Sequence, residues 1–326
     1  MERNLPTTWY SQLIRKISYR AGEMGVYLAV LLVLLIIAII QPSFFQMGNL
    51  FTVLRTASIL SIVSIGQLLV ILVGGIDLSV GSMMTTAVII SADITRGADE
   101  KLWLAVILCI LIAFVNAGLN IFLILKRNVP PFVATLGTYV LMDGARLLYT
   151  KGVPQGAPSP FLQTLGRDVI FEIPITLIIA ICVSILFMIV LKKMRFGRQI
   201  YAAGSNPEAA RLSGIPVQRI IASAYILCSL LAMFTGLILG GYIGYADRYL
   251  GRGFDLDSIS AVVIGGASFA GGIGGVGGTI AGILLMVILS NFMTMLNLNV
   301  QLQLVMKGLV ILLAVGLYVN TRRNKS

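Results

Sequence analysis

The sequence predicts an all-α, polytopic membrane protein with about ten transmembrane helices. Of its 326 residues, 58% are hydrophobic and only 11% are charged, whereas a soluble domain carries about 25% charged residues. The apolar residues also form unbroken blocks, such as 24–40, 102–125 and 173–191. Each block approaches the roughly 20 residues that a helix needs to cross a bilayer. Composition and block length together therefore disfavour a soluble fold.

Ten segments reach or approach this length, in chain order. The predicted spans are 24–41, 54–75, 77–94, 102–125, 132–150, 173–191, 220–245, 257–270, 275–297 and 302–320. We therefore expect a single transmembrane domain over 24–320, with 192–219 as its long cytoplasmic loop. An N-terminal segment at 1–23, cytoplasmic or interfacial, precedes it, and a cytoplasmic tail at 321–326 follows.

The basic residues indicate the orientation. With the N-terminus inside, the cytoplasmic face receives the Lys and Arg residues of 1–23, 126–127, 192–219 and 322–325. The opposite face receives Arg96, Lys101, Lys151, Arg167, Arg248 and Arg252. Because cytoplasmic loops of membrane proteins are enriched in Lys and Arg, we expect both termini in the cytoplasm. The net charge of +11 reflects this topology, and no nucleic-acid partner is expected.

Two segments have the character of re-entrant or broken helices. The span 257–270 is short and leads into the Gly-rich run 271–278, and Gly74 and Gly75 join two spans almost without a loop. Irregular backbone at membrane depth survives only where protein or water covers it, so the breaks point to a transport pathway. Tight turns and close helix packing are assigned to Gly74, Gly75, Gly265, Gly266, Gly271, Gly272, Gly274 and Gly278.

Several polar side chains lie within the predicted spans. The candidate pathway residues are Gln67, Asp77, Asn116, Asn120 and Asn291. Neutral amides suit a polyol because they both donate and accept hydrogen bonds, but hydrogen bonding between helices explains them equally well. Asp77 has two interpretations as well, a helix cap at the break or a group that lines the pathway.

The loop 192–219 contains a short helix with a defined start and stop. Asn206 can cap it with Pro207 in the first turn, or Ser205 and Glu208 can form a capping box. Gly214 then ends it after about two turns. A capped cytoplasmic helix suits docking to a soluble partner, with Ser205, Asn206, Pro207, Glu208, Arg211 and Gly214 as the candidate residues, although a plain loop helix has the same pattern.

The residue inventory argues against catalysis. The chain contains no histidine, which removes Ser–His and Cys–His pairs and His-ligated metals. Cys109, Cys182 and Cys228 all lie inside apolar segments, so no disulfide or metal framework is expected. A Gly-x-Gly-x-x-Gly match in the run 271–278 does not follow a strand and is not a nucleotide site. The sequence also lacks a phosphate-binding loop, so we expect neither enzymatic activity nor a cofactor.

Three motifs carry a resemblance to a known family. They are GIDLSVGS at 75–82, GRQIYAAGSNPEAARLSGI at 197–215, and DSISAVVIGG at 257–266 with the following Gly271 and Gly272. Together with Asn49-Leu50 and PFVATL at 131–136, they resemble the ribose-type sugar permeases of bacterial ABC importers over residues 42–315.

The resemblance implies a multi-pass permease of the bacterial inner membrane that translocates a monosaccharide. It further implies a second permease subunit, a cytoplasmic ABC ATPase that binds the ATP and Mg²⁺, and a periplasmic or lipid-anchored sugar-binding protein. The helix at 205–214 would then be the coupling helix that contacts the ATPase.

Two other transporter classes remain open at this stage. An ion-coupled secondary transporter also uses broken helices, but it usually needs several intramembrane carboxylates, and here only Asp77 and Asp143 are near candidates. An amino-acid permease of an ABC importer is the second alternative.

Overall fold

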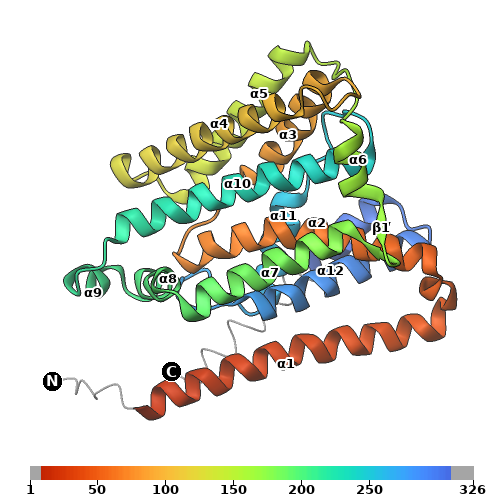
Figure 1. Ribbon diagram of the computed structural model, residues 1–326. Helices are drawn as coiled ribbons and strands as arrows, with labels where there is room; N and C mark the ends of the chain where they lie inside the picture. Colours follow the sequence, from red (N-terminus) through yellow and green to blue (C-terminus); the bar gives the residue numbers. More distant parts are fainter. Residues whose placement is uncertain (1–8, 310–326) are drawn as a thin grey trace.

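The computed structural model describes residues 9–309, and most of these are helical (Figure 1). The helices are α1 (Trp9–Ile40), η1 (Pro42–Phe45), α2 (Met47–Leu72), α3 (Val80–Thr95), α4 (Leu102–Ile121), η2 (Phe122–Lys126), α5 (Pro131–Thr150), α6 (Pro160–Arg167), α7 (Ile175–Lys193), α8 (Arg195–Ser205), α9 (Pro207–Leu212), α10 (Val217–Ile243), α11 (Phe254–Ile264) and α12 (Val276–Met295). Residues 300–309 are helical too. Two short antiparallel strands, β1 (Val169–Ile170) and β2 (Ile173–Pro174), form a hairpin. The predicted all-α class is confirmed.

Five helices within 9–309 are long and apolar enough to cross a membrane. They are α2, α4 with its continuation η2, α7, α10 and α12. Two shorter apolar helices, 25–40 within α1 and the whole of α3, accompany them. The multi-pass membrane character is therefore confirmed. The predicted span 132–150 forms α5, which is not among the five, and most of 302–320 lies outside the described residues.

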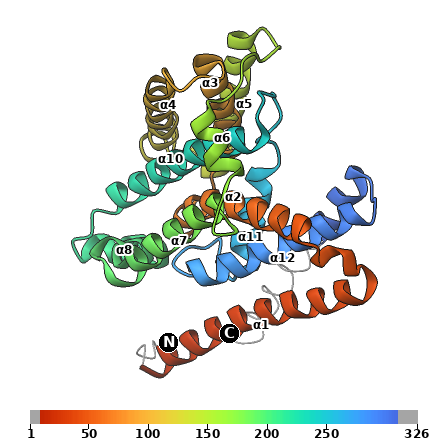
Figure 2. The same ribbon diagram turned by 45° about the vertical axis from the view of Figure 1, so that its right-hand side comes forward.

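Helix α10 packs against α2, α3, α4 and α6, and α7 and α12 pack on α2 (Figures 1 and 2). Most of α2 is buried, whereas α4 and α7 expose apolar side chains along their outer faces. This distribution is expected where lipid covers the outside of a helical bundle. Helix α1 runs along the lower edge in both views and packs on α12, where the Tyr27 hydroxyl donates to the Gly277 carbonyl at 2.9 Å.

Glycines set the closest helix contacts. A Cβ at Gly236 of α10 would lie 2.4 Å from the Met84 carbonyl oxygen of α3. Likewise, a Cβ at Gly265, just after α11, would lie 2.3 Å from the Gly278 carbonyl oxygen of α12. Small residues permit this backbone approach, which is a common way for helices to associate in membranes.

The structure differs from the prediction at α1, α6 and α8. Helix α1 runs unbroken from Trp9 to Ile40. The predicted boundary between the segment 1–23 and the span 24–41 therefore falls inside one continuous helix. Helices α6 and α8 were not predicted, because both are short and amphipathic. For α6, Ser159 is the N-cap and accepts from the Leu162 amide at 3.3 Å, with a proline in the first turn.

The ends of the bundle are distinct. The N-terminal end of α1 lies at the same end as α8 and α9, on the left of Figure 1. The hairpin and α6 lie at the opposite end, on the right. Helix α11 has only 11 residues, which span about 16 Å and cannot cross a hydrocarbon core of about 30 Å.

Candidate functional site

The break between α2 and α3 forms a buried polar centre around Asp77, whose side chain is fully buried. Its Oδ1 accepts from the Ser79 amide at 2.9 Å and from the Ser79 hydroxyl at 2.5 Å. The side-chain amide of Gln67 pairs with the Asp77 backbone, donating to its carbonyl at 3.0 Å and accepting from its N–H at 3.2 Å. The Asp77 side chain therefore stabilises the turn that precedes α3, and Gln67 of α2 hydrogen-bonds to the Asp77 backbone.

Helices α4 and α10 complete this centre. The Asn116 amide nitrogen donates to the Ser79 hydroxyl at 2.9 Å and to the Ser229 hydroxyl at 3.3 Å. Two buried oxygens in the centre have no hydrogen-bond partner among the described residues, Oδ2 of Asp77 and Oδ1 of Asn116. Neutral donors and acceptors thus dominate, and no described Lys or Arg side chain forms an ion pair with Asp77.

Two glycines explain why the chain breaks here. The Gly74 backbone has a φ of +79°, and its N–H donates to the Ile71 carbonyl at 2.9 Å, which ends α2. A Cβ on Gly75 would lie 2.4 Å from the Tyr225 hydroxyl oxygen. Gly74 supplies a left-handed turn. Gly75 lacks a side chain, which allows Tyr225 of α10 to lie against the backbone of the break.

The other two candidate pathway residues hydrogen-bond elsewhere. Asn120 accepts from the Thr138 hydroxyl at 2.8 Å and so links α4 to α5. Asn291 of α12 exchanges two hydrogen bonds, each of 3.0 Å, with Asn49 of α2. The structure thus brings Gln67, Asp77 and Asn116 together, and it places Asn120 and Asn291 in separate contacts between helices.

Helix α9 has the predicted start and stop. Asn206 accepts from the amides of Glu208 at 3.1 Å and Ala209 at 3.0 Å, so it is the N-cap. Ser205 is the last residue of α8, and the Asn206 cap is the one of the two alternatives that the structure shows. Gly214, with a φ of +79°, follows the helix end.

The exposed surface of α9 carries a charged pair and an apolar side chain. Glu208 and Arg211 form an ion pair of 3.6 Å and are both highly exposed. Leu212 is 80% exposed. Together these residues present charge and an apolar contact on a helix of six residues.

The chain that leads into α9 contacts both broken segments. A Cβ on Gly204 of α8 would lie 1.8 Å from the Leu72 carbonyl oxygen and 2.7 Å from the Gly272 nitrogen. The Gly272 N–H itself donates to the Leu72 carbonyl at 2.8 Å. The Tyr201 hydroxyl adds a bond of 2.9 Å to the Gly274 carbonyl. Helix α8 therefore rests directly on the end of α2 and on the Gly-rich turn before α12.

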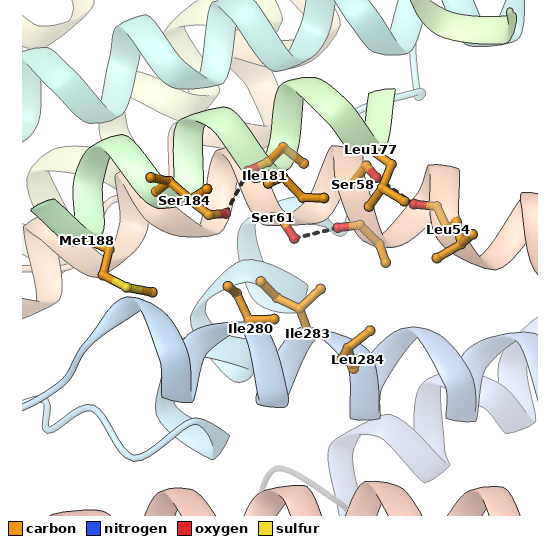
Figure 3. Close-up of a pocket in the computed structure, with 13 residues that line it drawn as sticks. Leu54, Ser58, Ser61, Leu177, Ile181, Ser184, Met188, Ile280, Ile283 and Leu284 are labelled. Carbon is orange, nitrogen blue, oxygen red and sulfur yellow. Dashed lines mark hydrogen bonds between the residues drawn. The ribbon is translucent and has the colours of Figure 1, made fainter. Parts of the chain in front are cut away.

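An apolar pocket of about 200 Å³ opens between α2, α7 and α12 (Figure 3). It contains three serines, but each hydroxyl donates to a carbonyl one turn earlier in its own helix, at 2.6 Å for Ser58, 2.7 Å for Ser61 and 2.6 Å for Ser184. The pocket wall consequently offers almost only hydrocarbon surface and suits an acyl chain better than a polar solute.

A polar pocket of about 300 Å³ lies between α3, α5 and the loop 244–253. Its lining is Gly81, Ser82, Thr85, Tyr139, Asp143, Arg146, Arg248, Tyr249 and Arg252. None of the five candidate pathway residues lines either pocket. Sequence reasoning missed this group, although Asp143 and Arg146, one helical turn apart in an otherwise apolar segment, were the available signal.

Comparison with known proteins identifies related transporters. A family model described as branched-chain amino acid transport system / permease component matches residues 49–315, which is most of the chain. The chain is 37% identical to the ribose import permease protein RbsC of Bacillus subtilis, over 90% of this chain and 91% of the relative. It is 35% identical to the RbsC protein of Escherichia coli, over 90% and 92%.

A relative named for a different sugar is also similar. The galactose/methyl galactoside import permease protein MglC of Haemophilus influenzae is 33% identical, over 90% of this chain and 93% of its own. No solved structure matches the chain.

Proposed function

The chain belongs to the branched-chain amino acid transport system / permease component family, and from this membership we propose that it is the membrane-spanning permease of an ABC importer that carries a monosaccharide into the cytoplasm. The observation that carries the proposal is the similarity, over 90% of the chain, to ribose import permeases. The chain itself performs no catalysis, and ATP with Mg²⁺ binds to a separate ATPase subunit.

A sugar fits better than an amino acid, despite the description of the family. The relatives named above include ribose and galactose import permeases, at 33% identity or more. The break between α2 and α3 is surrounded by hydroxyl and amide groups from Ser79, Asn116 and Ser229. Hydroxyl and amide groups of this kind both donate and accept hydrogen bonds, as sugar hydroxyls do.

The proposed topology has about ten spans with both termini in the cytoplasm of a bacterial cell. Support comes from the arrangement of the bundle, in which α8, α9 and the start of α1 lie at one end (Figure 1). This end holds the basic residues Lys192, Lys193, Arg195 and Arg198, around the start of α8. The breaks before α3 and after α11 then lie within the membrane and are covered by protein.

The partners that we propose are a cytoplasmic ABC ATPase, a sugar-binding protein outside the membrane and a second permease subunit, identical or related. Helix α9 is the element that docks on the ATPase. Its cap at Asn206 defines its start, and the exposed Glu208, Arg211 and Leu212 provide a contact surface. Such rigid, capped helices transmit a displacement better than a flexible loop does.

In the proposed mechanism, ATP-driven closure of the ATPase pushes on α9 and switches the permease between outward-facing and inward-facing states. The displacement reaches the end of α2 and the Gly-rich turn before α12 through Gly204, which touches both. Because α2 ends at one break and α12 begins at the other, a small shift of α8 can switch both helices between two positions. The sugar follows the path that these breaks open.

The direct test is to purify the tagged chain from native membranes in mild detergent and identify its partners by mass spectrometry. We expect a stoichiometric ATPase and a second permease copy or relative. Reconstitution with these partners and a sugar-binding protein should give ATP-dependent uptake of a radiolabelled monosaccharide. Uptake that needs an ion gradient and no ATPase would replace the proposal with an ion-coupled carrier.

A further inference from the structure

We propose that the polar pocket between α3, α5 and the loop 244–253 is a binding site for the transported sugar, which it holds through the ring hydroxyls. This inference rests on the proposed function and adds a defined site to it. Residues 244–253 follow α10 at the end of the bundle opposite α9, in Figure 1. In the proposed topology, this is the face at which a binding protein releases sugar.

Arg146 is the central donor of the pocket. It is only 7% exposed, and its guanidinium donates to the Ser82 carbonyl at 3.1 Å and to the Arg248 carbonyl at 3.4 Å. It also pairs with Asp143. Its Nε, however, is buried and has no partner among the described residues. The guanidinium therefore holds the Asp143 carboxylate and the Ser82 and Arg248 backbone in place at the pocket wall.

The other polar groups supply both hydrogen-bond acceptors and further donors. Asp143 accepts from Arg146 and from the Ser82 hydroxyl through Oδ1 only, so within residues 9–309 its Oδ2 is open to a ligand. Arg248 and Arg252 lie over the Tyr249 ring, at 4.8 Å and 6.0 Å from its centroid. Neither forms an ion pair with a described residue. Their N–H groups therefore remain available.

This mixture matches a polyol. Each sugar hydroxyl donates one hydrogen bond and accepts others, so it is satisfied where a carboxylate and guanidinium groups converge. A small anion would be attracted by the arginines, but it would also meet the Asp143 carboxylate at the pocket wall. The volume of about 300 Å³ is at the lower end of the range for ligand pockets and suits a small molecule.

The pocket is preformed by close backbone contacts. A Cβ on Gly81 of α3 would lie 2.6 Å from the Gly251 carbonyl oxygen. The Gly251 N–H donates to the Thr85 hydroxyl at 3.0 Å. These contacts fix the loop 244–253 on α3, so Tyr249 and Arg252 keep their positions without a ligand. A preformed site loses less free energy to ordering when it binds.

Thiol protection tests the proposal in native membrane vesicles. The reporter is Ser82→Cys in a Cys182→Ser background, labelled with a small methanethiosulfonate reagent with and without D-ribose or D-galactose. We expect one of these sugars to slow labelling by about twofold at a concentration equal to its Kd. The matched control is Ser184→Cys in the apolar pocket, whose labelling rate should not change. Tyr249→Cys is labelled in parallel as a second reporter, because Tyr249 is 53% exposed whereas Ser82 is only 1% exposed.

The second half of the test substitutes the side chains that are proposed to bind the sugar. Adding Asp143→Asn or Arg252→Gln to the reporter should abolish the protection at the same sugar concentration. Absence of protection by either sugar, or protection by inorganic phosphate alone, would overturn the proposal. Sugar uptake by the unsubstituted complex is measured in parallel. Uptake without protection rejects this site and leaves the proposed function intact, whereas sugar uptake that needs an ion gradient and no ATPase contradicts the proposed function itself.

Discussion

Gly204 at the end of α8 lies so close to Leu72 at the end of α2 that a Cβ on residue 204 would be 1.8 Å from the Leu72 carbonyl oxygen. The same oxygen accepts from the Gly272 N–H at 2.8 Å. Backbone from three distant segments thus meets at one point, and Asn206, the cap of α9, is two residues away. Movement of α9 would reach both broken segments through backbone contacts alone.

We therefore expect Gly204→Ala to impair uptake severely. The added methyl group collides with backbone rather than with a flexible side chain, so α8 must move away from α2. Overpacking of this kind costs about 1–3 kcal/mol. Thermal unfolding of the purified chain and uptake by the reconstituted complex measure the two effects.

Gly118→Ala is the matched control for this substitution. Gly118 lies in α4, and a Cβ there meets nothing within 4 Å. Alanine favours the helix over glycine by up to about 1 kcal/mol, so this variant should be as stable as the parent or slightly more so. If Gly204→Ala were equally harmless, the contact of α8 with α2 would not transmit the movement of α9.

Substitution of Glu208 or Arg211 should uncouple ATP hydrolysis from sugar uptake. Both side chains are highly exposed, and their mutual ion pair of 3.6 Å adds little to folding stability. Loss of a docking contact worth about 1.4 kcal/mol would weaken docking of the ATPase by about tenfold, and the sugar transported per ATP should fall with it. The assay compares ATPase rate and uptake for Glu208→Gln, Arg211→Gln and the control Glu172→Gln, which lies in the hairpin at the opposite end. Normal coupling in both α9 variants would contradict the docking role.

Local sequence signals predicted the elements that depend on local physics. The apolar blocks gave the long helices, because length and hydropathy suffice to define a membrane helix. The cap at Asn206 and the break at Gly74 follow from preferences of single residues for helix ends and for positive φ. Two local signals pointed to Gln67, Asp77 and Asn116. All three are polar residues within apolar segments, and Asp77 also lies at a helix break.

Contacts between distant segments escaped prediction for a physical reason. Nothing in the neighbourhood of Gly204 indicates that Leu72 or Gly272 packs on it, because this contact depends on how helices associate. The polar pocket escaped prediction for the same reason, because Arg248 and Arg252 lie in a loop whereas Arg146 lies in α5, far from them in the sequence. For Asn291, hydrogen bonding between helices was one of the two interpretations that the sequence left open, and the structure shows such a contact with Asn49.

Asp77→Asn should fold and transport nearly as well as the parent. The Asp77 Oδ1 accepts two hydrogen bonds from Ser79, and an asparagine oxygen accepts the same two bonds. No described basic residue pairs with Asp77, so a full negative charge has no stabilising partner there. Asp77→Ala, by contrast, leaves the buried Ser79 N–H unsatisfied and should cost about 1–3 kcal/mol.

Thermal unfolding and uptake of the two Asp77 variants decide this point. The order of stability that we expect is parent, then Asn close to it, then Ala clearly lower. If the Asn variant lost uptake as fully as the Ala variant while remaining folded, a negative charge at residue 77 would be required for transport, and the capping role alone would be insufficient.

The ion pair between Lys307 and Asp257 should hold the helix at 300–309 on α11. The Lys307 nitrogen lies 2.9 Å and 3.2 Å from the two carboxylate oxygens, and the side chains are 23% and 29% exposed. Partial burial places the pair between exposed pairs, worth under about 1 kcal/mol, and buried pairs, where removing one partner costs about 3–5 kcal/mol. We expect Lys307→Met or Asp257→Asn to lower the free energy of unfolding by about 1–3 kcal/mol.

A double-mutant cycle separates this pair from other effects of the two substitutions. Each single variant leaves one partner without its counter-charge, whereas the double variant leaves neither, so the double variant should be more stable than the sum of the single losses predicts. The cycle is measured by thermal unfolding of the purified chain, at low and at high salt. Because the pair is partly shielded from solvent, its coupling energy should fall only modestly with salt. Additive losses would mean that Lys307 and Asp257 contribute independently, and the helix at 300–309 would then be held by its apolar contacts alone.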